Sequence, residues 1–180
     1  ATGLKQHGSL SIACDDARFE EMKRGASMAG NCGLEVHVLT PEQAKEKNPL
    51  LRIDDVVGAV FLPKDGQLNP IDVTRALSIG ARRGGARIVE NCKVTGIKTR
   101  NGKVSGVSTS QGDVACDYIV NCAGMWAREV GRMAGVAVPL HAAEHFYVVT
   151  EPIPGLPRDL PVLREPGRCI YVKEDAGKLL

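Results

Sequence analysis

The chain has 180 residues, 43% of them hydrophobic, which is enough to bury one substantial core or parts of two smaller ones. The net charge is +2, and lysines and arginines are interleaved with acids, so the sequence lacks the basic stripe of a nucleic-acid-binding protein. No apolar run approaches the roughly 20 residues that cross a bilayer, and the N-terminus has no signal-peptide pattern. We therefore expect a soluble, cytoplasmic protein with neither nucleic acid nor membrane as a partner.

The six cysteines include no C-x-x-C pair, and most of them lie inside apolar, strand-like runs. A chain with this much apolar content does not need disulfides to fold, so buried free thiols in a reducing compartment are the expectation.

The first third of the chain alternates strand and helix patterns. Thr40 is an N-cap candidate, Pro41 suits the first helical position, and Gln43 completes a capping box, so a short helix begins here. The expected elements are a strand at 7–14, a helix at 16–29, a helix from 41 to about 47, and a strand at 56–63.

The middle of the chain opens on a second strong helix, which begins at Asn69-Pro70 and ends before Gly84-Gly85. Its inner face is small and suited to lying close on a sheet, with Val73, Ala76, Leu77, Gly80 and Ala81. A β-meander and a buried strand follow, with an Asn101-Gly102 hairpin turn. The expected strands are 86–91, 93–100, 103–110, 113–116 and 117–123.

A helix is then expected from Met125 to about Ala134, ended by Gly135, with Trp126, Val130 and Met133 facing inward. Residues 144–151 and 168–175 return to strand patterns, separated by a proline-rich connection. The chain starts without an introductory element and stops in what reads as the middle of a strand. We therefore expect a piece of a longer protein.

One stretch, "IVNCAGMWAREV" at 119–130, reads as a strand that turns on a glycine and continues as a helix. A glycine at such a turn lets a phosphate approach the backbone, where the helix dipole favours negative charge. No G-x-G-x-x-G precedes this turn in the chain, so the sequence contains at most part of a dinucleotide site.

A zinc peptidase is an alternative, because His141, Glu144 and His145 form the pattern H-x-x-E-H. That chemistry needs a helix, in which two histidines four residues apart share one face. These residues instead lie between a proline and a β-rich segment, and in a strand the two histidines would stand roughly 13 Å apart. We therefore expect no metal site. A non-catalytic binding module stays open as a further alternative.

Several motifs, in order and at the right intervals, together resemble the central part of the FAD-dependent dimethylglycine and sarcosine dehydrogenases, within the D-amino-acid-oxidase-like flavoprotein superfamily. The resemblance covers nearly the whole chain. It is carried by "GSLSIA", "VVGAVFLPKDGQLNPIDVTRALSIGARRGGARI", "VTGI", "DYIVNCAGMWAREVGRMAGVAVPLHAAEHFYVVTEP" and "DLPVLRE…CIYVKED".

The resemblance implies an α/β (α+β) fold: part of an FAD-binding, Rossmann-like sheet with a β-meander, plus a mainly antiparallel substrate-domain sheet with helices. Residues 70–137 would belong to the FAD domain, and residues 1–69 and 138–180 to the substrate domain. The glycine-rich turn that holds the FAD pyrophosphate lies upstream of the matched region in this family. The fragment alone is therefore expected to hold no FAD and to be inactive.

For the cofactor, the resemblance implies backbone roles only. Val94 in "KVTG" matches a position whose backbone faces the adenine, and Ala123-Gly124 match the turn close to FAD. These three residues are the cofactor-binding candidates.

For catalysis, the resemblance implies that an N-methyl amino acid loses hydride to the flavin, leaving an iminium for water or a folate carrier. His145 and Tyr147 match the family's H-x-Y strand, and Tyr171 matches a tyrosine that faces the substrate. In a strand His145 and Tyr147 would lie about 7 Å apart on one face, with Phe146, a departure from the family's usual glutamine, on the other. The implied partners are a small secondary or tertiary amine and an electron acceptor protein or folate. In a eukaryote the implied location is the mitochondrial matrix.

Overall fold

The computed structural model describes residues 2–180, which separate into two compact units. The described residues up to Arg83 and those from Tyr147 onward form the first unit, and Gly84–Phe146 form the second. Both combine helices with strands, which confirms the α/β class. Among the described residues, no helix is both long and apolar enough to cross a membrane.

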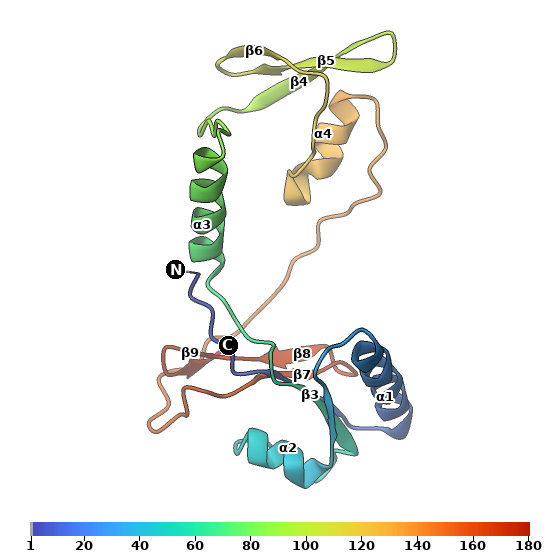
Figure 1. The fold of residues 1–180 in the computed structure, drawn as a ribbon, viewed down its shortest axis with the longest axis vertical. Coiled ribbons are helices and arrows are strands. Elements are labelled where there is room, and N and C mark those ends of the chain that lie inside the picture. Colours follow the sequence, from blue (N-terminus) through green and yellow to red (C-terminus); the bar gives the residue numbers. More distant parts are fainter. Residues whose placement is uncertain (1) are drawn as a thin grey trace. The chain divides into compact units, whose positions relative to one another are not determined.

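A five-stranded sheet organises the first unit, with strand order β2-β3-β1-β7-β8 (Figure 1). Strand β1 pairs antiparallel with β3 and parallel with β7, and the remaining pairs are antiparallel. The sheet is therefore mainly antiparallel, as expected. Its strands are β1 (Ser9–Ala13), β2 (His37–Leu39), β3 (Gly58–Leu62), β7 (Val162–Glu165) and β8 (Ile170–Val172).

Two of these strands, β2 and β7, were not predicted from the sequence. They have three and four residues, too few for an alternating pattern to be distinguished from a loop. Pairing with β3 and β1 makes them strands.

Both predicted helices of the first unit form, α1 (Asp16–Asn31) and α2 (Pro41–Lys47). The capping box at the start of α2 is complete: the Gln43 backbone N–H donates to the Thr40 hydroxyl, and the Thr40 N–H donates to the Gln43 side chain. Local hydrogen bonding thus sets where this helix begins.

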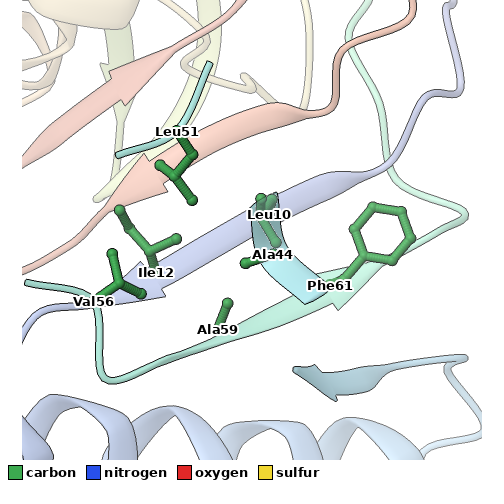
Figure 2. Packing of buried hydrophobic residues seen from close by; sticks show 7 residues of the cluster. All are labelled: Leu10, Ile12, Ala44, Leu51, Val56, Ala59 and Phe61. Atoms are coloured by element: carbon green, nitrogen blue, oxygen red, sulfur yellow. The ribbon is translucent and has the colours of Figure 1, made fainter. Parts of the chain in front are cut away.

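Alternation along β1 divides its side chains between two faces of the sheet. Leu10 and Ile12 point into a buried cluster that collects residues from β1, β3, α2 and the loop after α2 (Figure 2). The cluster contains Leu10, Ile12, Ala44, Leu51, Val56, Ala59 and Phe61.

The opposite face of the sheet is covered in part by α1. Gly58 of β3 makes room for the Phe19 ring: a β-carbon at this glycine would lie 2.2 Å from the ring. Helix α1 packs against β1, β2 and β3. On the side of the sheet where α1 lies, β7 and β8 carry the exposed side chains of Arg164 and Tyr171.

A two-stranded hairpin, β9 (Glu174–Asp175) with β10 (Lys178–Leu179), and helix α3 (Pro70–Arg83) complete the first unit. Helix α3 buries none of its residues, and Leu77 is 69% exposed. The small face predicted to lie on a sheet therefore has no sheet against it among the described residues.

The second unit contains the predicted β-meander, with strands β4 (Val94–Arg100), β5 (Lys103–Thr109) and β6 (Gly112–Ala115) in consecutive antiparallel order. Asn101 and Gly102 both have positive φ, 53° and 74°, as a type I′ hairpin turn requires. This turn was predicted correctly.

Three predicted strands do not form: residues 86–91, 117–123 and 144–151 have no strand structure. Tyr118 and Val120 are 90% and 84% exposed, although their apolar run reads as a buried strand. A strand is stable only beside a hydrogen-bonded neighbour, and none of these three segments joins a described sheet; only Thr150, at the end of the third, exchanges hydrogen bonds with Leu179 of β10.

The helix predicted from 125 is split into a short 3₁₀ turn, η1 (Gly124–Trp126), and α4 (Ala127–Met133). Trp126 was predicted to face inward but is 64% exposed, because it belongs to the turn and not to the packed helix. Val130 and Met133 are partly buried.

All six cysteines are free thiols, as expected, but the prediction that they are buried is wrong. Cys32 caps α1 and Cys169 lies in the β7–β8 turn with a φ of 55°. Cys122 lies in the segment that forms no strand. These three are exposed, and the others are partly exposed.

Candidate functional site

The turn at residues 121–124 is built by the Asn121 side chain. Its amide donates to the Ala127 carbonyl at 2.9 Å, and its carbonyl oxygen accepts from the Ala123 N–H at 3.2 Å. Gly124 then takes a left-handed φ of 55°, and a β-carbon there would meet nothing within 4 Å. The backbone at Ala123-Gly124 is therefore open to close approach by another molecule.

Val94, the other cofactor-binding candidate, is the first residue of β4 and pairs with Thr109 of β5. It is 36% exposed, and α4 packs against its strand. Val94, Ala123 and Gly124 thus lie in one unit, and each is at least partly exposed. That fits one wall of a dinucleotide site, without the glycine-rich cradle for the pyrophosphate.

Tyr171, a catalytic candidate, lies in the edge strand β8 and is 58% exposed. It stands directly opposite Arg164 of β7, whose other neighbour in the register is Ser11 of β1. Sequence analysis missed Arg164, although it lies in the motif "DLPVLRE". Its place beside Tyr171 depends on strand pairing, which no local pattern reveals.

The other catalytic candidates lie in the segment that forms no strand. His145 and Tyr147 are both exposed, Tyr147 by 71%, and the boundary between the two units falls between them. The regular strand face on which both were expected is not formed, and their roles stay proposals.

The geometry of a zinc peptidase is absent as well, since residues 141–145 have no helical structure. Within residues 2–180, no group of three or more His, Cys, Asp or Glu side chains is arranged to hold a metal.

Two buried carboxylates shape the strand ends next to Tyr171. Glu165, at the end of β7, accepts hydrogen bonds from the backbone N–H groups of Gly167 and Arg168, which tightens the β7–β8 turn. Within this turn, Arg168 pairs at 3.1 Å with Asp55, which lies in the loop before β3. These contacts hold the hairpin that carries Arg164 and Tyr171.

Glu174, the second carboxylate, has a fully buried side chain. It accepts from Arg158 and from the Gly177 N–H, both at 2.7 Å, and lies 3.5 Å from the Lys5 ammonium. Burial raises the pKa of Glu174, but the Gly177 N–H, Arg158 and Lys5 outweigh it, so the pKa lies below the usual carboxyl value. The ionised form is the stable one in the fold.

The family model for FAD dependent oxidoreductases matches residues 1–180. The chain is 41% identical to sarcosine dehydrogenase, mitochondrial, of Mus musculus, over 96% of this chain and 19% of that protein. It is 38% identical to human dimethylglycine dehydrogenase, mitochondrial, over 99% of this chain and 21% of that protein. It is also 35% identical to the mouse pyruvate dehydrogenase phosphatase regulatory subunit, over 99% of this chain and 21% of that protein.

Among solved structures, L-proline dehydrogenase from P. horikoshii superimposes with a TM-score of 0.85 at 28% identity. That match covers 99% of this chain and 48% of the proline dehydrogenase chain.

The chain therefore belongs to the FAD dependent oxidoreductase family. Its resemblance to the sarcosine and dimethylglycine dehydrogenases is confirmed over nearly its whole length. The chain spans about a fifth of the length of these curated relatives.

Proposed function

We propose that these residues are part of an FAD-dependent enzyme that oxidises a small N-methyl amino acid of the sarcosine or dimethylglycine type. The observation that carries the proposal is the 41% and 38% identity to dehydrogenases named for these two substrates. Both relatives are named as mitochondrial, so we propose the mitochondrial matrix as the location if the source is eukaryotic.

We further propose that residues 70–137 belong to the FAD-binding part and that residues 1–69 and 138–180 belong to the substrate-binding part. Val94, Ala123 and Gly124 would approach FAD through their backbone, which the exposure of Val94 and the open space at Gly124 support. When bound, FAD supplies the hydride acceptor.

The protein must favour the neutral amine, because only the free base gives up hydride easily. An amine with a pKa of about 10 is mostly protonated at neutral pH, so a proton acceptor beside the nitrogen speeds the reaction. We assign this role to His145. Tyr147 and Tyr171 would orient the substrate through their hydroxyl groups.

Oxidation removes hydride from the carbon next to nitrogen and leaves an iminium. Water then adds to the iminium carbon, and the C–N bond breaks to release an aldehyde and the demethylated amine, or a folate carrier accepts that carbon; an electron acceptor protein takes the two electrons.

The test uses the full-length protein loaded with FAD, assayed with sarcosine and with dimethylglycine across a pH series. His145→Ala is expected to lower amine oxidation by about 10²-fold while FAD stays bound, as for the loss of a proton acceptor. Glu144→Ala, a neighbouring exposed residue, is the matched control and should retain activity. Unchanged kinetics of His145→Ala at every pH would remove His145 from the mechanism.

A non-catalytic regulatory role is the second candidate, because one relative at 35% identity is named a regulatory subunit. The two candidates differ in one readout. Substrate bleaches the flavin absorbance of a dehydrogenase under anaerobic conditions, whereas a regulatory protein shows no reduction with any N-methyl amino acid.

A further inference from the structure

The chain has six asparagines, and they differ in the residue that follows. Two of them, Asn48 and Asn69, precede prolines, which have no backbone N–H. Three others precede cysteines: Asn31, Asn91 and Asn121. Asn101 precedes Gly102, so it is the one asparagine of the sequence whose following N–H has no side chain beside it.

Asn101 and Gly102 form the tip of the β4–β5 hairpin, beyond its last residue pair, Arg100 with Lys103. Both tip residues are exposed, and a β-carbon added at Gly102 would meet nothing within 4 Å. The pairing of β4 with β5 is also irregular just after Lys98, close to the tip. Packing against the described residues therefore does not hold the turn closed, and the turn opens at a low cost in free energy.

The Gly102 N–H is accessible to a reacting group. In a two-residue hairpin turn, the residues that flank the turn make the inter-strand hydrogen bonds. None of residues 2–180 accepts a hydrogen bond from the Gly102 N–H or bonds the Asn101 side chain. Arg100 and Lys103 flank the turn with exposed cationic side chains. Their positive charge favours the nitrogen anion that forms when the Gly102 N–H loses its proton.

Two of the asparagines that precede cysteine are held by hydrogen bonds. The Asn121 side chain bonds the Ala127 carbonyl and the Ala123 N–H. After Asn31, at the end of α1, the Cys32 N–H donates to carbonyls of the helix. At each of these sites, a group needed for a reaction between the side chain and the following amide is already occupied.

Asn91 resembles Asn101 in exposure and in backbone conformation, with a φ of 55° against 53°. It differs in the residue that follows, because Cys92 has a β-carbon next to its N–H. The Gln111 side chain also donates to the Asn91 carbonyl at 3.3 Å. Asn91 is therefore a control for Asn101 within the same unit.

We infer that Asn101 is a site of spontaneous covalent modification, at which the side-chain amide is lost as ammonia. The Gly102 nitrogen gives its proton to solvent base and bonds to Cγ of Asn101. The Cγ–Nδ2 bond breaks, and Nδ2 takes a proton from solvent and leaves as ammonia. The product is a five-membered cyclic imide, and no oxidant, metal or cofactor takes part. This inference is independent of the proposed function.

Water then opens the imide in one of two ways. Cleavage of the bond between Cγ and the Gly102 nitrogen leaves aspartate at position 101, which a type I′ turn accepts. Cleavage at the main-chain carbonyl carbon of position 101 leaves isoaspartate, which lengthens the backbone by one atom. The longer backbone cannot keep Arg100 opposite Lys103, so isoaspartate opens the end of the hairpin.

The test follows the full-length, FAD-loaded protein during incubation in mildly alkaline buffer. Mass spectrometry of its peptides detects the gain of one mass unit at each asparagine, and isoaspartyl methyltransferase labels isoaspartate but not aspartate. Asn101 is expected to convert at least about tenfold faster than Asn91, because glycine leaves the attacking nitrogen unhindered. Its rate should lie within about tenfold of that in a synthetic peptide of residues 98–105, because the turn opens easily.

Asn101→Gln is the matched variant, because its longer side chain would have to close a six-membered ring, which forms more slowly. It should abolish both the mass gain at position 101 and the methyltransferase label on this hairpin. If the ratio of Asn101 to Asn91 falls below about tenfold, glycine at the turn gives no advantage and the inference is wrong. It is also wrong if the peptide converts more than about tenfold faster than the folded protein, since the turn then protects Asn101.

Discussion

At the scale of single residues, the buried charge of Glu174 shows how the first unit is tied together. Its carboxylate accepts hydrogen bonds from Arg158 and Gly177 and approaches Lys5, which is 169 residues away in the sequence. Gln67 adds a hydrogen bond to the Glu174 carbonyl. One side chain therefore connects the start of the chain, the loop before β7 and the β9–β10 hairpin.

Glu174→Ala is expected to lower the free energy of unfolding by about 2 kcal/mol, because the buried Gly177 N–H loses its acceptor and the half-exposed Arg158 and Lys5 lose their ionic partner. Urea unfolding measures the change. Asp175→Ala, an exposed neighbour in the same strand, is the control and should change stability by less than about 0.5 kcal/mol.

The contribution of Glu174 to the free energy of unfolding depends on pH in a definite direction. Because the folded pKa of Glu174 lies below its ordinary value of 4.5, its contribution is complete above that pH and is lost as the pH falls through the folded pKa. The stability difference between wild type and Glu174→Ala should therefore shrink below about pH 4.5. A difference that grows on acidification contradicts this assignment.

At the scale of elements, the contact between α1 and β3 depends on one glycine. A β-carbon at Gly58 would lie 2.2 Å from the Phe19 ring, so any side chain there displaces the aromatic ring from the sheet. The partly buried Phe19 and the buried Ala26 face the sheet as the helical spacing predicts.

Gly58→Ala is expected to destabilise the protein by about 1–3 kcal/mol through overpacking. Phe19→Leu in the same chain should recover part of this loss, and a double-mutant cycle in urea measures the coupling. Gly80→Ala is the matched control: nothing lies within 4 Å of its added β-carbon, and α3 gains helix propensity. Additive effects of the two substitutions at 58 and 19 would show that ring displacement is not the cause.

At the scale of the whole molecule, the chain belongs to a family of FAD dependent oxidoreductases, but the 180 residues contain no glycine-rich dinucleotide turn. Val94 is 36% exposed and Gly124 has open space beside its backbone, as their proposed contacts with FAD require. No G-x-G-x-x-G occurs in the 180 residues, and that turn normally holds the pyrophosphate.

The 180-residue chain purified alone is therefore expected to contain no FAD and to oxidise no amine. Absorbance near about 450 nm is the measurement, since bound flavin is yellow. Incubation with excess FAD followed by gel filtration is the control for cofactor lost during purification. A stoichiometric flavin peak in the isolated chain would mean that the dinucleotide site lies elsewhere.

Local signals account for most of the elements that were predicted correctly. The Thr40 capping box, the Asn101-Gly102 turn and the helical spacing of Phe19 and Ala26 each act over a few residues, so each is legible in the sequence. The α/β class, the meander and the family resemblance follow from such local patterns taken in order.

Other features depend on partners that are distant in the chain. Strands β2 and β7 are too short for an alternating pattern to identify them in the sequence. Apolar segments such as 117–123 have a pattern typical of strands but join no sheet and are largely exposed. The candidate site divides in the same way: Tyr171 was found through the resemblance, whereas Arg164 emerged only from the strand register.

The sequence by itself determined the first three helices, the meander with its Asn101-Gly102 turn and the family, because capping, turn chemistry and hydrophobic periodicity are properties of neighbouring residues. Only the tertiary structure decided which strands pair, that Glu174 is buried against Lys5 and Arg158, and that Arg164 stands beside Tyr171. The physical reason is that strand pairing and charge burial take their free energy from groups far apart in the chain, which local patterns do not record.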